Sequence, residues 1–180
     1  MTTITEVTCA CGQCALALEG QPFVTAECHC TSCRTAGERL GRLPLARPMQ
    51  LSNGGTHFVL YRKDKVRFIR GQDLLREYRL KPDAPTRRVV ASCCNSPIFL
   101  EFQGAHWLSL YASLWPADTA PQPELRTMTS DLGPGKVLDD SLPAGRLPTV
   151  RFYWKLLAAW IAMGFKNPAI AVNGEVRLTA

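Results

Sequence analysis

The chain has 180 residues, of which 46% are hydrophobic and 20% are charged, a composition that supports the buried core of one domain with or without an appendage. It carries 21 Lys and Arg against 15 Asp and Glu, a net charge of +6, but the basic residues are scattered and form no nucleic-acid-binding patch. Residues 1–8 lack the pattern of a secretory signal, and no run of about 20 apolar residues predicts a membrane span. We therefore expect a cytoplasmic protein with no nucleic-acid partner and no membrane contact.

Short β-prone runs separated by Gly, Pro and polar residues fill the first two thirds of the chain. Residues 4–19 contain a strand at 15–19, residues 28–36 read as a cysteine-rich turn, and residues 40–55 as a loop with brief strands. Further strands are expected at 56–62, 65–70, 75–80 and 87–92, and a hairpin at 98–102 and 107–114 with its turn near Gln103-Gly104. This spacing predicts a mainly β fold of antiparallel strands.

The last third of the chain changes character. Residues 116–149 are rich in Pro, Gly and Asp, with one short strand near 125–128. Residues 152–164 predict a C-terminal helix that ends at Gly164 and Pro168. Because this helix is apolar almost all round, we expect it to pack on the sheet or on a second copy through Trp154–Phe165; an interfacial membrane anchor is the alternative.

Seven of the eight cysteines fall into three groups, and reduced cytosolic thiols clustered in this way indicate metal binding or catalysis. In an extended segment alternate side chains share a face, so Cys28 and Cys30 can aim at one point, and a turn at Thr31-Ser32 brings Cys33 back to it. Three thiolates can hold one tetrahedral Zn²⁺ and leave its fourth position open, as catalytic zinc sites do.

The other two groups predict a second, closed site. Cys9 and Cys11 form a pair that Cys93 or Cys94 would complete, tying the first strand to the centre of the sheet. Adjacent cysteines point in opposite directions in a regular strand, so Cys93 and Cys94 cannot easily bind one ion together. Thiolates favour zinc over magnesium or calcium, and two zinc ions per chain follow.

Other interpretations of the cysteines stay open at this point. They could be buried free thiols, disulfides or the ligands of an iron–sulfur centre. Strand alternation turns His29 away from the metal, and Cys14 reads as a core thiol. No catalytic residue stands out, since the chain has no nucleophile elbow and no phosphate-binding loop.

Three motifs in order carry a family resemblance. Cys9-x-Cys11-Gly12, then Cys28-His29-Cys30-x-x-Cys33-Arg34, then a late cysteine group before Ser96-Pro97 resemble the glutathione-dependent formaldehyde-activating enzymes, also called Gfa-like or Mss4-like zinc proteins. The likeness runs from about residue 7 to about residue 130. It implies a Gfa-like zinc-binding β domain at 1–130, built as a β-tent of antiparallel sheets. The expected Pro/Gly-rich linker and apolar helix at 131–180 lie outside the resemblance.

The resemblance also implies a chemistry. Cys9, Cys11 and the late cysteines would hold a structural zinc, and Cys28, Cys30 and Cys33 the catalytic one. Members of the family join formaldehyde to glutathione and are described as carbon–sulfur lyases, so a small thiol such as glutathione is the expected partner. The late group departs from the usual C-x-x-C-G: with Cys94 aligned to the second cysteine, Ala91 and Asn95 stand at the first Cys and Gly positions. This alignment implies Cys94 as one ligand, with Cys93 or Cys14 as the fourth. The sequence here resembles an uncharacterised Cys-Cys-Asn-Ser-Pro branch of the same superfamily.

Three functions compete on this evidence. The first is an enzyme that acts on glutathione or other thiol–aldehyde adducts at the open zinc. The second is a non-catalytic zinc module that binds a protein partner or a second copy through Trp154–Phe165. The third is a thiol-redox or metal-storage protein.

Overall fold

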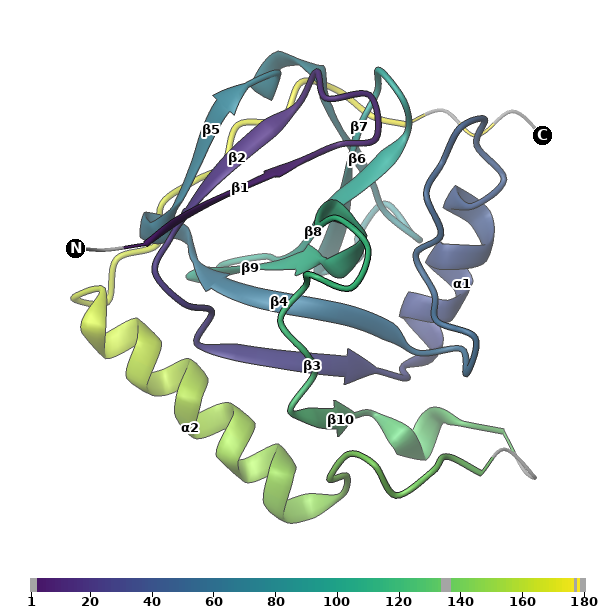
Figure 1. The fold of residues 1–180 in the computed structure, drawn as a ribbon, viewed down its shortest axis with the longest axis vertical. Coiled ribbons are helices and arrows are strands. Elements are labelled where there is room, and N and C mark those ends of the chain that lie inside the picture. Colours follow the sequence, from purple (N-terminus) through teal and green to yellow (C-terminus); the bar gives the residue numbers. More distant parts are fainter. Residues whose placement is uncertain (1–2, 134–136, 177, 179–180) are drawn as a thin grey trace.

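The computed structural model describes residues 3–133, 137–176 and 178, and they form two β-sheets and two α-helices (Figure 1). The smaller sheet is antiparallel in the order β1-β2-β5, with β1 at Ile4–Thr8, β2 at Ala15–Glu19 and β5 at Val66–Arg70. The larger sheet has seven strands in the order β10-β3-β4-β9-β8-β7-β6. Their bounds in chain order are β3 Val24–Cys28, β4 Thr56–Arg62, β6 Leu75–Tyr78, β7 Thr86–Ala91, β8 Ser96–Phe102, β9 Trp107–Tyr111 and β10 Leu125–Thr127.

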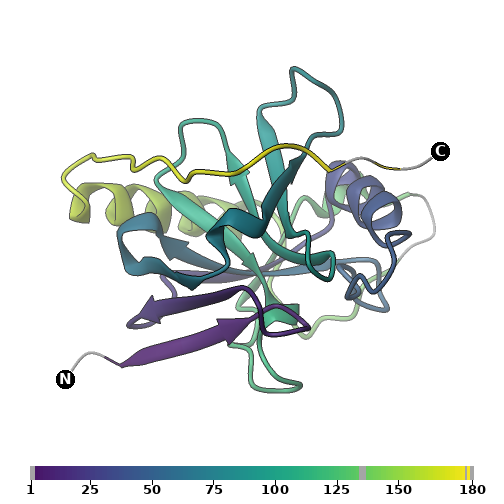
Figure 2. The ribbon, with the colours of Figure 1, turned by 90° about the horizontal axis from the view of Figure 1, so that it is seen from above.

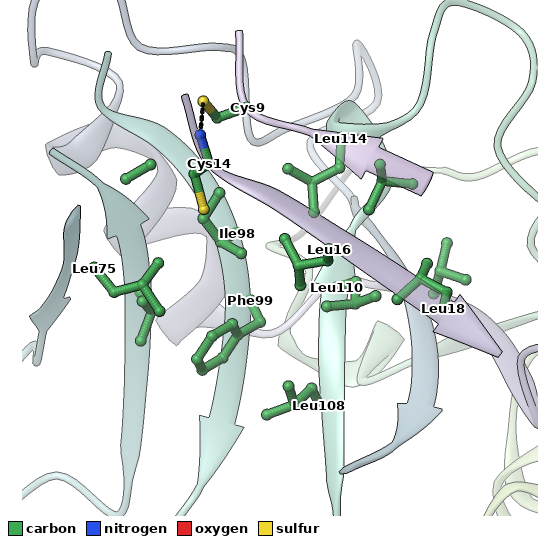
Figure 3. Close-up of a cluster of buried hydrophobic side chains, with 14 of the residues drawn as sticks. Cys9, Cys14, Leu16, Leu18, Leu75, Ile98, Phe99, Leu108, Leu110 and Leu114 are labelled. Carbon is green, nitrogen blue, oxygen red and sulfur yellow. Dashed lines mark hydrogen bonds between the residues drawn. The ribbon is translucent and has the colours of Figure 1, made fainter. Parts of the chain in front are cut away.

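One face of the larger sheet packs against the smaller sheet and forms the main hydrophobic core. Leu16 and Leu18 of β2 face Leu108 and Leu110 of β9, and all four are fully buried (Figure 3). Because side chains alternate along a strand, the residues between them point to the opposite face of their own sheet. The larger sheet therefore has side chains on a second face, which also has to be covered.

The two helices cover that second face (Figure 2). Helix α1 spans Thr31–Leu40 and helix α2 spans Arg146–Ala162. Both contribute to a second cluster of buried side chains, in which Leu40 of α1 and Leu156 of α2 accompany Phe58 and Leu100 of the sheet. Single 3₁₀ turns lie at Lys63–Lys65, Gln72–Leu74, Ala112–Leu114 and Thr129–Asp131.

The predicted mainly β architecture with a C-terminal helix is confirmed, with four differences in detail. Residues 31–40 form helix α1 where a turn was expected, because Cys30 caps the helix with its sulfur and the apolar residues recur at helical spacing. Strand β10 pairs parallel to β3, so the larger sheet is mixed. Helix α2 starts at Arg146, since Pro148 is tolerated in a first helical turn. Residues 41–55 contain no strand.

The segment after α2 returns across the molecule and adds to the edge of the larger sheet. Backbone N–H groups of Glu77 and Val176 donate to the carbonyls of Gly174 and Glu77, at 2.9 and 2.8 Å. The domain boundary at residue 130 stays a prediction. Within the described residues, no helix has both the length and the apolar character needed to cross a membrane.

Candidate metal centres

Four cysteine sulfurs converge between the β1–β2 turn and the turn after β7, and we call them the closed cluster. They belong to Cys9, Cys11, Cys93 and Cys94, and all lie within 4.8 Å of one another. The Sγ atom of Cys9 is 3.6 Å from that of Cys11 and 3.8 Å from that of Cys93, and the Sγ atoms of Cys93 and Cys94 are 3.8 Å apart. Tetrahedral zinc with Zn–S bonds of about 2.3 Å places its sulfurs about 3.8 Å apart, so this donor set fits a four-thiolate ion.

Two tight turns bring these sulfurs together. Gly12 adopts φ +75° and its N–H donates to the carbonyl of Cys9, which folds Cys11 back toward Cys9. Strand β7 ends at Ala91, and residues 92–95 form a turn with Asn95 at φ +52°. The expectation that adjacent cysteines must diverge was therefore wrong: it assumed a strand, whereas a turn aims both thiols at one point.

Hydrogen bonds favour a charged sulfur in the closed cluster. The N–H of Cys14 donates to the Cys9 sulfur at 3.2 Å. The Ser96 hydroxyl oxygen accepts from the Ala10 N–H at 2.9 Å and lies 3.1 Å from the Cys94 sulfur, so its own proton is free to point at that sulfur. Burial raises the pKa of Cys94, but the hydrogen bonds from Ser96 and the Cys11 backbone outweigh it and lower the pKa to about 6.

Cys14 lies outside this cluster. Its side chain is fully buried and points into the hydrophobic core beside Ile98, away from the Cys9 sulfur (Figure 3). Burial, together with the neighbouring thiols, raises the pKa of Cys14 to about 12. Cys14 is thus a neutral core thiol, and its backbone, not its sulfur, serves the cluster.

The remaining three cysteines meet where β3 passes into α1, and we call them the open cluster. The sulfurs of Cys28, Cys30 and Cys33 lie within 4.8 Å of one another, and no further Cys, His, Asp or Glu of the described residues joins them. Cys28 ends β3, and Cys30 is the N-cap of α1, its sulfur accepting from the Cys33 N–H at 3.3 Å. A helix N-terminus stabilises negative charge, so this position suits a thiolate.

The three thiols of the open cluster cannot all ionise without a cation. Hydrogen bonds with Cys28 and Cys33 lower the pKa of Cys30, whereas the hydrogen bond with Cys30 raises the pKa of Cys28. The pKa of Cys33 is raised well above its ordinary value, chiefly by hydrogen bonds with the other two thiols and by burial. Negative charge on one sulfur therefore disfavours ionisation of its neighbours, and a divalent cation would favour the charged form of all three.

A buried arginine supplies positive charge to the open cluster. Arg88 of β7 is fully buried, and among the described residues no carboxylate lies within 4.0 Å of its guanidinium. Its Nη2 donates to the Ser32 hydroxyl at 3.2 Å, and that hydroxyl lies 3.3 Å from the Cys30 sulfur. A buried guanidinium requires a counter-charge, which thiolates of the open cluster would provide through Ser32.

A cavity of about 1100 Å³ opens beside the open cluster, between the larger sheet and α2. All three cysteines line it, together with Phe58 of β4 and Trp160 of α2. The fourth direction around the open cluster therefore faces space that a ligand could enter, whereas the closed cluster already has four sulfurs.

The histidines take no part in either cluster. His29 is fully buried, and its Nε2 lies 2.6 Å from a carboxylate oxygen of Glu27. Nε2 of His57 lies 2.9 Å from the Pro121 carbonyl oxygen, and His106 stacks on Trp160 with ring centroids 5.8 Å apart.

Sequence reasoning missed Ser32, Ser96 and Arg88. A signal for the two serines was present, because each follows a cysteine by two residues, in Cys30-Thr31-Ser32 and in Cys94-Asn95-Ser96. No signal distinguished Arg88 from Arg87, since both are ordinary basic residues at the start of a strand.

Comparisons with known proteins leave the chain without a family. No family model matches it, and no curated protein matches it. Among solved structures, a structural-genomics crystal structure of a Rhodobacter sphaeroides protein covers 78% of this chain and 100% of its own, with 14% sequence identity and a TM-score of 0.46. A similarity this distant supports no statement about function.

Proposed function

We propose that the chain binds two Zn²⁺ ions, one structural in the closed cluster and one functional in the open cluster, and acts as a carbon–sulfur lyase on thiol–aldehyde adducts. The observation that carries this proposal is the contrast in ligand number: four sulfurs converge at one site, and three at the other, where the fourth direction faces a cavity. Three protein ligands with one open position are typical of catalytic zinc. The resemblance of the cysteine motifs to the glutathione-dependent formaldehyde-activating enzymes supports the same chemistry.

The reaction class follows from an open thiolate-rich site. Bound zinc would lower the pKa of an added thiol and hold its sulfur beside a carbonyl carbon. Addition forms a sulfur–carbon bond, moves the carbonyl π electrons onto oxygen, and transfers the thiol proton to that oxygen; lyase cleavage is the reverse. The N-terminus of α1 and the Arg88–Ser32 pair offset the negative charge that collects at Cys30.

Metal quantification with a thiol titration tests this proposal. We expect two zinc ions per chain, one of which changes its ligands when glutathione is added, as followed by absorption of the cobalt-substituted protein. Cys28→Ser should lower the metal content to one ion and abolish the response to thiol. Cys14→Ser, which alters a cysteine outside both clusters, should keep two ions. Full metal content and unchanged thiol response in Cys28→Ser would refute the proposal.

A non-catalytic interaction module is the second candidate, and the outer face of α2 favours it. Trp154 and Ile161 are 65% and 54% exposed and do not line the cavity, and Phe165 beyond the helix is 58% exposed. Apolar side chains grouped on one exposed surface are typical of an interface with a partner or a second copy. Sedimentation of Trp154→Glu against the unaltered chain tests it: a dimer that dissociates in the variant would support the module, and a monomer in both would count against self-association.

A further inference from the structure

The cavity at the open cluster is elongated and mostly apolar. Its walls come from one face of the larger sheet and from the inner face of α2. Cys28 pairs with Thr56 at one end of β4, and Trp107 pairs with Arg62 at the other, so the wall extends over the seven residues of β4, roughly 20 Å. Aromatic and aliphatic side chains line most of this length, chiefly Phe58, Leu60, Leu100, Trp107, Phe152 and Leu156.

The charge of the cavity does not suit glutathione. Among the described residues that line it there is no Lys and no Arg, and the one charged side chain is the acidic Asp131. Glutathione carries two carboxylates, and desolvating an unpaired carboxylate in an apolar site is costly. The described Lys and Arg residues lie elsewhere on the molecule.

One polar atom lies buried among these walls at the end away from the thiols. His106 is 5% exposed, lines the cavity and stacks on Trp160, and its Nε2 has no hydrogen-bond partner among the described residues. Buried polar atoms are normally paired, so this atom could pair with a polar group at the far end of a ligand, beyond the apolar length of the cavity.

We propose that the thiol that binds at the open cluster is apolar. Its sulfur would bind the metal ion held by Cys28, Cys30 and Cys33, and its hydrocarbon chain would lie along the cavity between β4 and α2. The inference rests on the proposed function, because it requires a thiol to bind at the open cluster. Its substrates are then adducts of aliphatic or aromatic thiols with aldehydes. The reaction keeps the balance given above, and only the substituent on sulfur changes.

A series of straight-chain thiols tests the inference. The probes are n-butanethiol, n-hexanethiol and n-octanethiol, each titrated into the cobalt-substituted protein and followed by the thiolate-to-cobalt absorption band, with glutathione as comparison. Each buried methylene contributes about 0.8 kcal/mol, which is about fourfold in affinity, so binding should tighten about fourfold per methylene. Glutathione should bind more weakly than n-octanethiol.

Two variants of α2 show where the chain of the thiol lies. Leu157 lines the cavity and is 39% exposed, so the Leu157→Glu variant should fold. Because it places a carboxylate in the apolar wall, it should weaken the binding of n-octanethiol at least about tenfold. Ile161, four residues along the same helix, is exposed and does not line the cavity, so Ile161→Glu should leave binding unchanged. Loss of binding in Ile161→Glu alone would place the thiol on the outer face and overturn the inference.

The remaining outcomes separate the inference from the proposed function. Equal affinity along the series, or tighter binding of glutathione, would overturn the inference of an apolar substrate and leave the proposal of a thiol-binding zinc in place. An absorption band that no thiol alters overturns both. Affinity that rises with chain length, together with weaker n-octanethiol binding in Leu157→Glu, would support both the inference and the proposed function.

Discussion

The two cysteine clusters share one local hydrogen-bond arrangement but differ in the number of sulfurs and in the donor that supports them. In each, a serine two residues after a cysteine accepts one N–H and presents its own proton to that cysteine's sulfur. In the closed cluster the donor is a neutral backbone N–H of Ala10, and four sulfurs surround the centre. In the open cluster the donor is the buried guanidinium of Arg88, and three sulfurs leave a side facing the cavity.

The difference indicates how a missing ligand is compensated. Four thiolates with a divalent cation would carry a net charge of −2, next to the exposed Cys11. Three thiolates with the same cation would carry a net charge of −1, which a single buried arginine can neutralise. With a divalent cation bound, the open cluster would keep a free coordination position without leaving uncompensated charge in the interior.

The largest expected effect is on folding, from the closed cluster. Cys9→Ser should remove one metal ion and lower the free energy of unfolding by more than about 4 kcal/mol, because this ion links the β1–β2 turn to the turn after β7. Thermal unfolding with metal analysis measures both quantities. Cys14→Ala is the control: it should keep both ions and lower the free energy of unfolding by only about 1 kcal/mol. If Cys28→Ser destabilised the fold as much as Cys9→Ser, the two clusters would not differ in their structural role.

The second effect concerns metal affinity at the open cluster. Arg88→Met should weaken metal binding there by about 10- to 100-fold, the usual consequence of removing a group that supports ligands from outside the coordination sphere. Competition with a chromophoric chelator measures it. Arg88→Lys, which keeps the charge and loses the guanidinium geometry, should lie between Arg88→Met and the unaltered chain. If Arg88→Met lowered the metal affinity of both clusters equally, Arg88 would stabilise the fold as a whole and have no specific role at the open cluster.

The smallest effect comes from the serines. Ser32→Ala and Ser96→Ala each remove one hydrogen bond to sulfur, so each should weaken its own cluster by about 1 kcal/mol, roughly fivefold in affinity, and leave the other unchanged. The same chelator competition, read separately for the two ions, checks this. A single serine that weakened both clusters would contradict the pairing seen between Ser32 and Cys30 and between Ser96 and Cys94.

Much of the fold and both cysteine groupings could be predicted from local pattern. Strands such as β2 and β4 match their predicted residues because their β-branched, aromatic and aliphatic runs stop at Gly or charged residues. Helix α1 was missed because its cap is a sulfur, whereas the recognised caps are Ser, Thr, Asp and Asn.

The rest depended on distant contacts. The convergence of Cys93 and Cys94 required a left-handed Asn95, which a sequence does not reveal. The role of Arg88 depends on which face of β7 turns toward α1, and a one-residue shift would have placed Arg87 there. The cavity exists because α2 lies where it does, and no local pattern fixes that position.

The shallow anchoring of α2 has a consequence for how the molecule fluctuates. Only Leu156 and Ala159 of its 17 residues are buried, and an ion pair between Lys155 and Glu124, both 40% exposed, ties it to the segment before β10. A helix held this lightly opens at a lower free energy than the strands beneath it. Amide hydrogens of α2 should therefore exchange with solvent deuterium well before those of β4 and β9, and a ligand filling the space below should slow α2 first.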